Sequence, residues 1–261
     1  MNKVKFTAIV LAAILGCGML TGCSVKMEDS SQTDASSAET ATEAETTRMD
    51  VDSYNDHVLD DIKTAERSDE PLEFAPLGDT ITPDANDIDG DLGSYRESVR
   101  GTKLYFDEKE FPPELMETLE QYFISFAEND YTMYTRCAYP DYLDKMEVFL
   151  SKEHGYDLKT SFASQCSNLA TTANGSFKVT RLKMDAAPQY DESKDNLTAY
   201  FERFKDILGD GYYDKLKKEV DNIYDGEFFV MAENRLGTEQ MLISAYEIVF
   251  VEKDGRFYVF G

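Results

Sequence analysis

The C-terminal stretch 248–261, IVFVEKDGRFYVFG, decides the fold. Asp254-Gly255 separates two short apolar runs, and Asp-Gly in this position is the strongest short-range sequence signal of a β-hairpin. We therefore expect a long strand over 240–252, a tight turn, and a short final strand over 256–260. A hairpin of this kind ends an antiparallel sheet whose other strands must come from further upstream.

The long strand carries apolar residues on both faces. Strict alternation places Met241, Ile243, Ala245, Val249 and Val251 on one face and Leu242, Tyr246, Ile248 and Phe250 on the other. A strand that is apolar on both faces near its end is covered on both sides, so we expect it to lie inside the sheet. On the final strand we expect Phe257 to point inward against a helix and Arg256 to face solvent.

Upstream, the hydrophobic period alternates between that of a helix and that of a strand. Helices are expected from Pro112 to Phe126, Pro140 to Gly155, Asp157 to Asn174 and Asp195 to Gly209, with a short one over 212–220. Strands are expected over 177–184 and 226–232. The order predicts an α+β fold in which N-terminal helices pack on an antiparallel sheet.

This order of elements resembles the nuclear-transport-factor-two-like, or cystatin-like, fold. Residues 110–261 are similar to a group of uncharacterised surface lipoproteins of Gram-positive bacteria, through Tyr139-Pro140 at a helix start and the hairpin 251–258. Phe257 takes the place that tryptophan more often holds in that hairpin. The resemblance implies a curved, cone-like sheet, and it leaves the activity open because the fold hosts binding modules and enzymes alike.

The N-terminus has the layout of a secretory signal, with two lysines followed by the apolar run 6–20. That run is shorter than the roughly 20 apolar residues that a permanent membrane span needs. Leu20-Thr21-Gly22-Cys23 at its end resembles the lipobox of bacterial lipoproteins, and 14–17 is a weaker second match. We expect a signal peptide over 1–22 and lipid on Cys23; an ordinary signal with a chance cysteine is the alternative.

Two regions separate the signal from the expected domain. Residues 23–50 are rich in Ser, Thr, Ala and acids and lack aromatics, which predicts a disordered acidic tether. Residues 51–109 are acidic and mostly irregular, with a short helix over 53–66 and one short strand over 101–106. Asp87–Gly90 has part of the spacing of a calcium loop but lacks both end ligands, so no metal site is predicted.

The composition limits the partners. The chain has 51 Asp and Glu against 26 Lys and Arg, a net charge of −25, which argues against nucleic acid and against docking on anionic lipid. The charge either keeps a tethered protein soluble or attracts a cationic partner. We expect contact with the membrane through the lipid on Cys23, an unidentified protein, glycan or small ligand as partner, and no cofactor.

The remaining cysteines and histidines do not form a recognisable zinc site. Outside the cytoplasm Cys137 and Cys166 are a plausible disulfide, with two buried free thiols as the alternative. His57 precedes the expected domain and His154 stands just before a glycine helix stop, so both are expected at the surface.

Known catalytic and nucleotide-binding motifs are missing from the sequence. Enzymes of the resembled fold use an acidic base and a tyrosine inside the cone, and that resemblance points to Tyr122, Tyr134 and Tyr246 as a ligand pocket, with Glu247 or Asp130 as the acid. A tyrosine in a chain with 16 of them is more often a packing residue, so no catalytic residue is assigned.

The sequence therefore predicts a lipid-anchored binding or interaction module of unknown ligand on the extracytoplasmic face of the cell membrane. A small acid–base enzyme with a tyrosine and carboxylate site is one alternative. A passive structural component of the envelope is the other.

Overall fold

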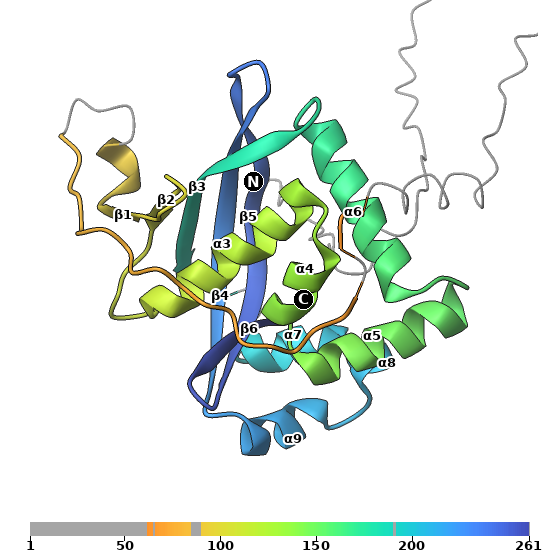
Figure 1. The fold of residues 1–261 in the computed structure, drawn as a ribbon. Helices are drawn as coiled ribbons and strands as arrows, with labels where there is room; N and C mark the ends of the chain where they lie inside the picture. The colour runs from red at the N-terminus through yellow and green to blue at the C-terminus, as the bar shows by residue number, and fades with distance from the viewer. Residues whose placement is uncertain (1–61, 65, 85–89, 190–191, 261) are drawn as a thin grey trace, which may run out of the picture.

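The computed structural model describes residues 62–260 except 65, 85–89 and 190–191 (Figure 1). The expected signal peptide, the tether, Cys23, His57 and almost all of the expected helix 53–66 lie outside the described residues.

The described chain is an α+β fold, as the sequence predicts. Its helices are η1 (Gly90–Leu92), α3 (Pro113–Glu128), α4 (Tyr131–Cys137), α5 (Pro140–Glu153), α6 (Leu158–Thr172), α7 (Asn196–Arg203), α8 (Lys205–Leu208) and α9 (Tyr212–Glu219). Its strands are β1 (Tyr95–Glu97), β2 (Lys103–Tyr105), β3 (Phe177–Ala186), β4 (Asn222–Asn234), β5 (Glu239–Lys253) and β6 (Arg256–Phe260).

These strands form one open sheet in the order β1-β2-β3-β4-β5-β6. Strands β3 to β6 are antiparallel, as expected, but β2 runs parallel to β3 with Leu104 opposite Leu182. The expectation of a purely antiparallel sheet is therefore wrong, and the sheet is mixed. The reason is the long connection α3–α6 between β2 and β3, which brings the chain back in the same direction.

The β5–β6 hairpin has the predicted turn. Asp254 and Gly255 have φ angles of 53° and 70°, so both central residues are left-handed, as a type I′ turn requires. Lys253 pairs with Arg256 across the turn, and Arg256 is exposed. Local turn chemistry thus sets the register of the last two strands.

The residue of β6 that is buried in the core differs from the predicted one. Phe257 is only half-buried and its ring lies 5.9 Å from that of Tyr224, whereas Phe260 is 1 % exposed. The Phe260 ring lies 4.9 Å from the ring of Tyr142 and 5.1 Å from that of Phe201. The strand enters the core toward its C-terminal end, so Phe260 takes the role that we expected of Phe257.

Strand β5 is buried at Ile248–Val251 on both faces, as predicted, but its face assignment further upstream is wrong. Phe228 pairs with Tyr246, while Val230, two residues on, pairs with Ile243, three residues back. The extra residue is a β-bulge, and Ala245 within it has φ 51°. The bulge moves Ile243 onto the face of Tyr246, although strict alternation separates them.

Helix ends follow the sequence closely. Asn129, with φ 55°, ends α3, and the Asp130 carboxylate then caps α4 by accepting the Met133 N–H at 2.8 Å. No helix was expected between Phe126 and Pro140, so α4 differs from the prediction. The expected helix 195–209 is interrupted at Phe204, which divides it into α7 and α8.

Helix α3 crosses in front of the sheet in Figure 1, with α4 and α6 beside it, and packs on β3 and β6. At the far side of the sheet, β6 is covered by the α4–α5 connection, where the Tyr139 N–H donates to the Val259 carbonyl at 2.9 Å. Residues before 110 also contribute to the core, since Leu77 and Leu104 belong to the same hydrophobic cluster as the helices and the sheet. Independent folding of 110–261 stays a prediction.

Candidate functional site

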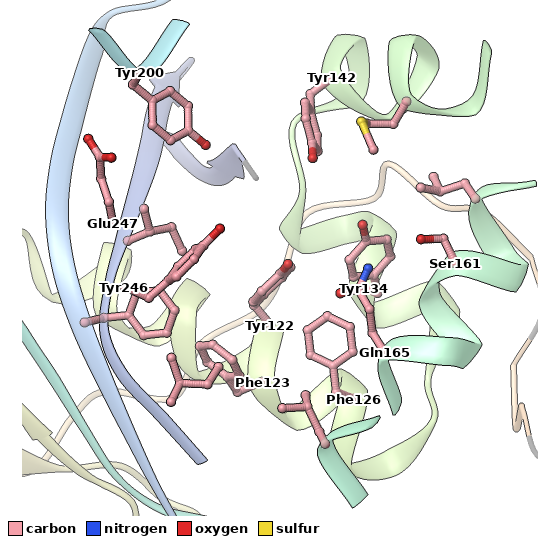
Figure 2. Close-up of a pocket in the computed structure, with 16 residues that line it drawn as sticks. Tyr122, Phe123, Phe126, Tyr134, Tyr142, Ser161, Gln165, Tyr200, Tyr246 and Glu247 are labelled. Atoms are coloured by element: carbon pink, nitrogen blue, oxygen red, sulfur yellow. The ribbon is translucent and has the colours of Figure 1, made fainter. Parts of the chain in front are cut away.

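A cavity of about 50 Å³ lies between the helices and strands β4 and β5 (Figure 2). Hydroxyl-bearing residues reach it from six elements: Tyr122 of α3, Tyr134 of α4, Tyr142 of α5, Ser161 of α6, Tyr200 of α7 and Tyr246 of β5. The cavity is therefore a product of tertiary packing, because no two of these side chains come from the same helix or strand.

Aromatic contacts hold the floor of the cavity in place. The Tyr122 ring lies edge-on to Phe126 at 4.9 Å and to Phe123 at 5.4 Å, all on the apolar stripe of α3. The Tyr134 ring lies 5.7 Å from that of Tyr122 and 4.9 Å from that of Phe162. Edge and tilted contacts at these distances are favourable and restrict how far each ring can turn.

Two local backbone features position Tyr134 and Tyr246 at the cavity. The Asp130 cap starts α4, and Tyr134 then lies one turn into that helix. The bulge at Ala245 turns Tyr246 toward the cavity on the same side as Ile243, and both residues line it. Bulges commonly re-aim a side chain in this way next to functional sites.

Figure 2 shows the tyrosine hydroxyls and Ser161 pointing toward a common central space. The Tyr200 hydroxyl donates to the Phe260 carbonyl at 2.6 Å. Tyr134 and Tyr142 are 3 % and 2 % exposed, and their hydroxyls face the cavity. A molecule in the cavity, water or a ligand, can therefore exchange hydrogen bonds with both hydroxyls.

The tyrosines at the cavity stay neutral at physiological pH. Burial raises the pKa of Tyr122, Tyr134, Tyr142 and Tyr200 well above the ordinary phenol value. Each hydroxyl therefore keeps its proton; Tyr200 donates its hydrogen bond to the Phe260 carbonyl, whereas the hydroxyls of Tyr134 and Tyr142 can each donate one hydrogen bond and accept others. The cavity presents hydrogen-bonding groups without presenting phenolate charge.

Among the described residues that line the cavity, Glu247 is the one charged side chain. One of its oxygens is bound by Arg203, and the other is buried with no hydrogen-bond partner among the described residues. Burial raises the pKa of Glu247, while Arg203 opposes that shift. Arg203 thus compensates part of the carboxylate charge from outside the cavity.

The structure brings together the three predicted pocket tyrosines, Tyr122, Tyr134 and Tyr246, and Glu247 at this cavity. Asp130, the other predicted acid, does not line it; its carboxylate caps α4 and accepts from Thr64.

Sequence analysis missed Tyr142, Ser161 and Tyr200. Tyr142 lies just inside the helix opened by Pro140, and Tyr200 lies on the apolar stripe of α7, so both had a visible sequence context. An apolar stripe on a helix has the same sequence pattern whether it packs in a core or lines a cavity, so the pattern does not identify these residues as lining a cavity.

Cys137 and Cys166 are separate, buried thiols in the structure, which corresponds to the second of the two alternatives. Burial raises the pKa of both, that of Cys166 to about 12. Neither is a reactive thiolate at neutral pH. His154 is exposed and lies between the rings of Phe149 and Tyr156.

The described residues contain no cluster of His, Cys, Asp and Glu that could hold a metal ion. None of the described helices combines the length and the apolar character needed to cross a membrane. Comparison of the chain with protein families, with curated proteins and with solved structures gave no match. Function is therefore inferred from the site and the sequence themselves.

Proposed function

We propose that the chain is a lipid-anchored module on the extracytoplasmic face of the cell membrane, and that its folded domain binds a small ligand in the tyrosine-lined cavity. The observation that carries the binding proposal is the pair of buried tyrosines, Tyr134 and Tyr142, whose hydroxyls face the same cavity. A typical hydrogen bond contributes about 0.5–1.5 kcal/mol, so a ligand that bonds to both hydroxyls gains affinity directly.

The anchoring proposal rests on Leu20-Thr21-Gly22-Cys23. Two acyl chains on Cys23, at about 0.8 kcal/mol per buried CH₂, would hold the protein on the membrane. The acidic stretch 23–50 then serves as a spacer, with an r.m.s. reach of roughly 25–30 Å, and separates the domain from the lipid headgroups.

The finer fold assignment, a nuclear-transport-factor-two-like cone, is part of the same proposal. It is supported by helices that precede an antiparallel run of strands and by a cavity between the helices and the sheet.

A small acid–base enzyme is the second candidate, and Glu247 at the cavity wall is the observation that favours it. A carboxyl group with a raised pKa beside tyrosine hydroxyls can act as a general acid or base in proton transfer. Arg203 already binds one carboxylate oxygen, and the other is buried, so the geometry supports binding better than catalysis. A passive structural role has no need of such a cavity.

The anchoring proposal is tested by Cys23→Ala. We expect the variant to lose incorporation of labelled fatty acid and to leave the membrane fraction or remain uncleaved. Cys17→Ala is the matched control and should behave as wild type. Fatty-acid labelling that survives in Cys23→Ala would refute the assignment of this cysteine.

The binding proposal is tested on protein isolated from its own cells. Small molecules released on unfolding are identified by mass spectrometry for wild type and for the double variant Tyr134→Phe/Tyr142→Phe. We expect a compound that accompanies wild type in stoichiometric amount and is depleted from the double variant. Tyr131→Phe removes a buried hydroxyl outside the cavity and should retain the compound. If wild type releases none, the cavity holds only water.

A further inference from the structure

We infer that the cavity selects an uncharged ligand that places a hydroxyl or carbonyl oxygen between Tyr134 and Tyr142 and an apolar part against the surrounding rings. This inference rests on the proposed binding function and specifies the ligand class for the same site. It follows from the charge, the size and the hydrogen-bonding groups of the cavity.

The charge of the walls excludes ions. No described residue that lines the cavity is cationic, so an anion would lose its hydration without gaining a charge partner. An ammonium group would find one carboxylate, Glu247; one of its oxygens has no hydrogen-bond partner among the described residues, but Arg203 binds the other and would repel a second cation. Both kinds of ion therefore lose more hydration free energy on binding than the site compensates, whereas an uncharged group loses little.

The size of the cavity limits the polar group to a few atoms. A volume of about 50 Å³ is a third of the roughly 150 Å³ of an apolar cavity that binds benzene, so a complete ring does not fit inside. A single oxygen with one or two attached carbons does fit. The rest of the ligand must then extend toward the entrance.

The entrance lies between α6 and β5. Gln165 of α6 and Ile243 and Tyr246 of β5 are half-buried, whereas Tyr122 and Tyr134 are buried. The bulge at Ala245 places two of these three side chains on one face of β5. Ile243 and the ring of Tyr246 supply apolar surface at this edge, beside the polar Gln165 and Glu247, and they suit a short alkyl part of a ligand.

The two hydroxyls specify oxygen as the polar atom. A carbonyl oxygen can accept from both Tyr134 and Tyr142, and a ligand hydroxyl can accept from one and donate to the other. Figure 2 shows the two hydroxyls directed into the same space from α4 and α5. A hydrocarbon without oxygen would leave both unpaired in the bound state.

The test compares 1-butanol, butyrate and butylammonium, which share an apolar chain and differ in the head group. Binding to the full chain in lipid nanodiscs is measured by NMR, with empty nanodiscs as the blank. We expect 1-butanol to bind at least tenfold more tightly than either ion. The double variant Tyr134→Phe/Tyr142→Phe should bind 1-butanol about tenfold more weakly, because it loses two hydrogen bonds, while Tyr131→Phe should be unchanged.

The outcomes separate this inference from the proposed function. Equal or tighter binding of butyrate or butylammonium would overturn the neutral ligand class and leave small-molecule binding in place. Undiminished 1-butanol binding by the double variant would overturn the role of the two hydroxyls. If no probe binds while wild type still releases a compound on unfolding, this inference alone falls. If no probe binds and no compound is released, the proposed function falls with it.

Discussion

Glu117 of α3 makes stability depend on pH in the direction opposite to most carboxylates. Its side chain is buried, and burial raises its pKa from 4.5 to about 7, with further contributions from Glu114 and Glu120, while Arg96 opposes the shift. The folded state therefore binds a proton more tightly than the unfolded state between these values. Stability from this group is present below pH 4.5 and is lost as the pH rises through about 7.

The size of the effect follows from the same values. Each tenfold change in an acid constant corresponds to about 1.4 kcal/mol, so the interval from 4.5 to about 7 sets an upper bound of roughly 3 kcal/mol. Solvent screening and the opposing Arg96 charge reduce this bound, so we expect Glu117→Gln to stabilise the protein by about 1–2 kcal/mol at pH 8.5. At pH 5.5 the gain should be smaller, because protonated glutamate and glutamine are then nearly equivalent.

Urea denaturation of the full chain at both pH values measures the effect. Glu110→Gln is the matched control, since it removes the same charge from an exposed position just before α3 and should change stability by less than about 0.5 kcal/mol. A gain for Glu117→Gln that is the same at pH 5.5 and 8.5, or a loss at pH 8.5, would refute the reasoning.

Three further predictions concern the fold. Phe260→Ala should cost about 3–5 kcal/mol and Arg256→Ala less than about 0.5 kcal/mol in urea denaturation, because the first ring is fully buried and the second side chain is exposed; equal losses would contradict the observed register of β6. Ala245→Gly should be tolerated and Ala245→Val should cost more than about 1 kcal/mol, since the bulge requires a positive φ; equal thermal stability of the two variants would argue against the bulge. The fragment 110–261 should unfold cooperatively on heating, and a melt without a sigmoidal transition would show that the preceding residues complete the core.

Elements with local sequence signals were predictable. The Asp254-Gly255 turn, the proline starts of α3 and α5 and the Asp157 and Asp195 caps each determine backbone geometry within a few residues. Short-range hydrogen bonds and fixed φ angles act independently of the rest of the chain, so the sequence alone contains them. Helix α4 has such a signal in Asp130, which caps it, although the sequence-based prediction did not include this helix.

The bulge in β5 had no such signal. Ala245 adopts a left-handed φ that is usual for glycine or asparagine, and the apolar pattern around it fits a regular strand equally well. The pairing of β4 with β5 imposes the extra residue, and pairing is a long-range property. For this reason the sequence misplaced Ile243 relative to Tyr246.

The sequence predicted several residues of the site but not their role. Tyr122, Tyr134 and Tyr246 were proposed together through a resemblance of fold, and they do meet at one cavity. Whether a buried tyrosine has a hydrogen-bond partner depends on every element around it. The convergence of the Tyr134 and Tyr142 hydroxyls on one cavity, on which the binding proposal rests, is therefore visible only in three dimensions.

The parallel pairing of β2 with β3 has a consequence for how fast this protein folds. Leu104 faces Leu182 across that pair, and α3, α4, α5 and α6 lie between them in the chain. Closing so long a loop costs conformational entropy before the β2–β3 pair contributes any contact. Strands β4, β5 and β6 follow one another directly in the chain, so their pairing closes only short loops. We therefore expect the C-terminal meander to form early and β2, with β1 beyond it, to join the sheet in the slowest step of folding.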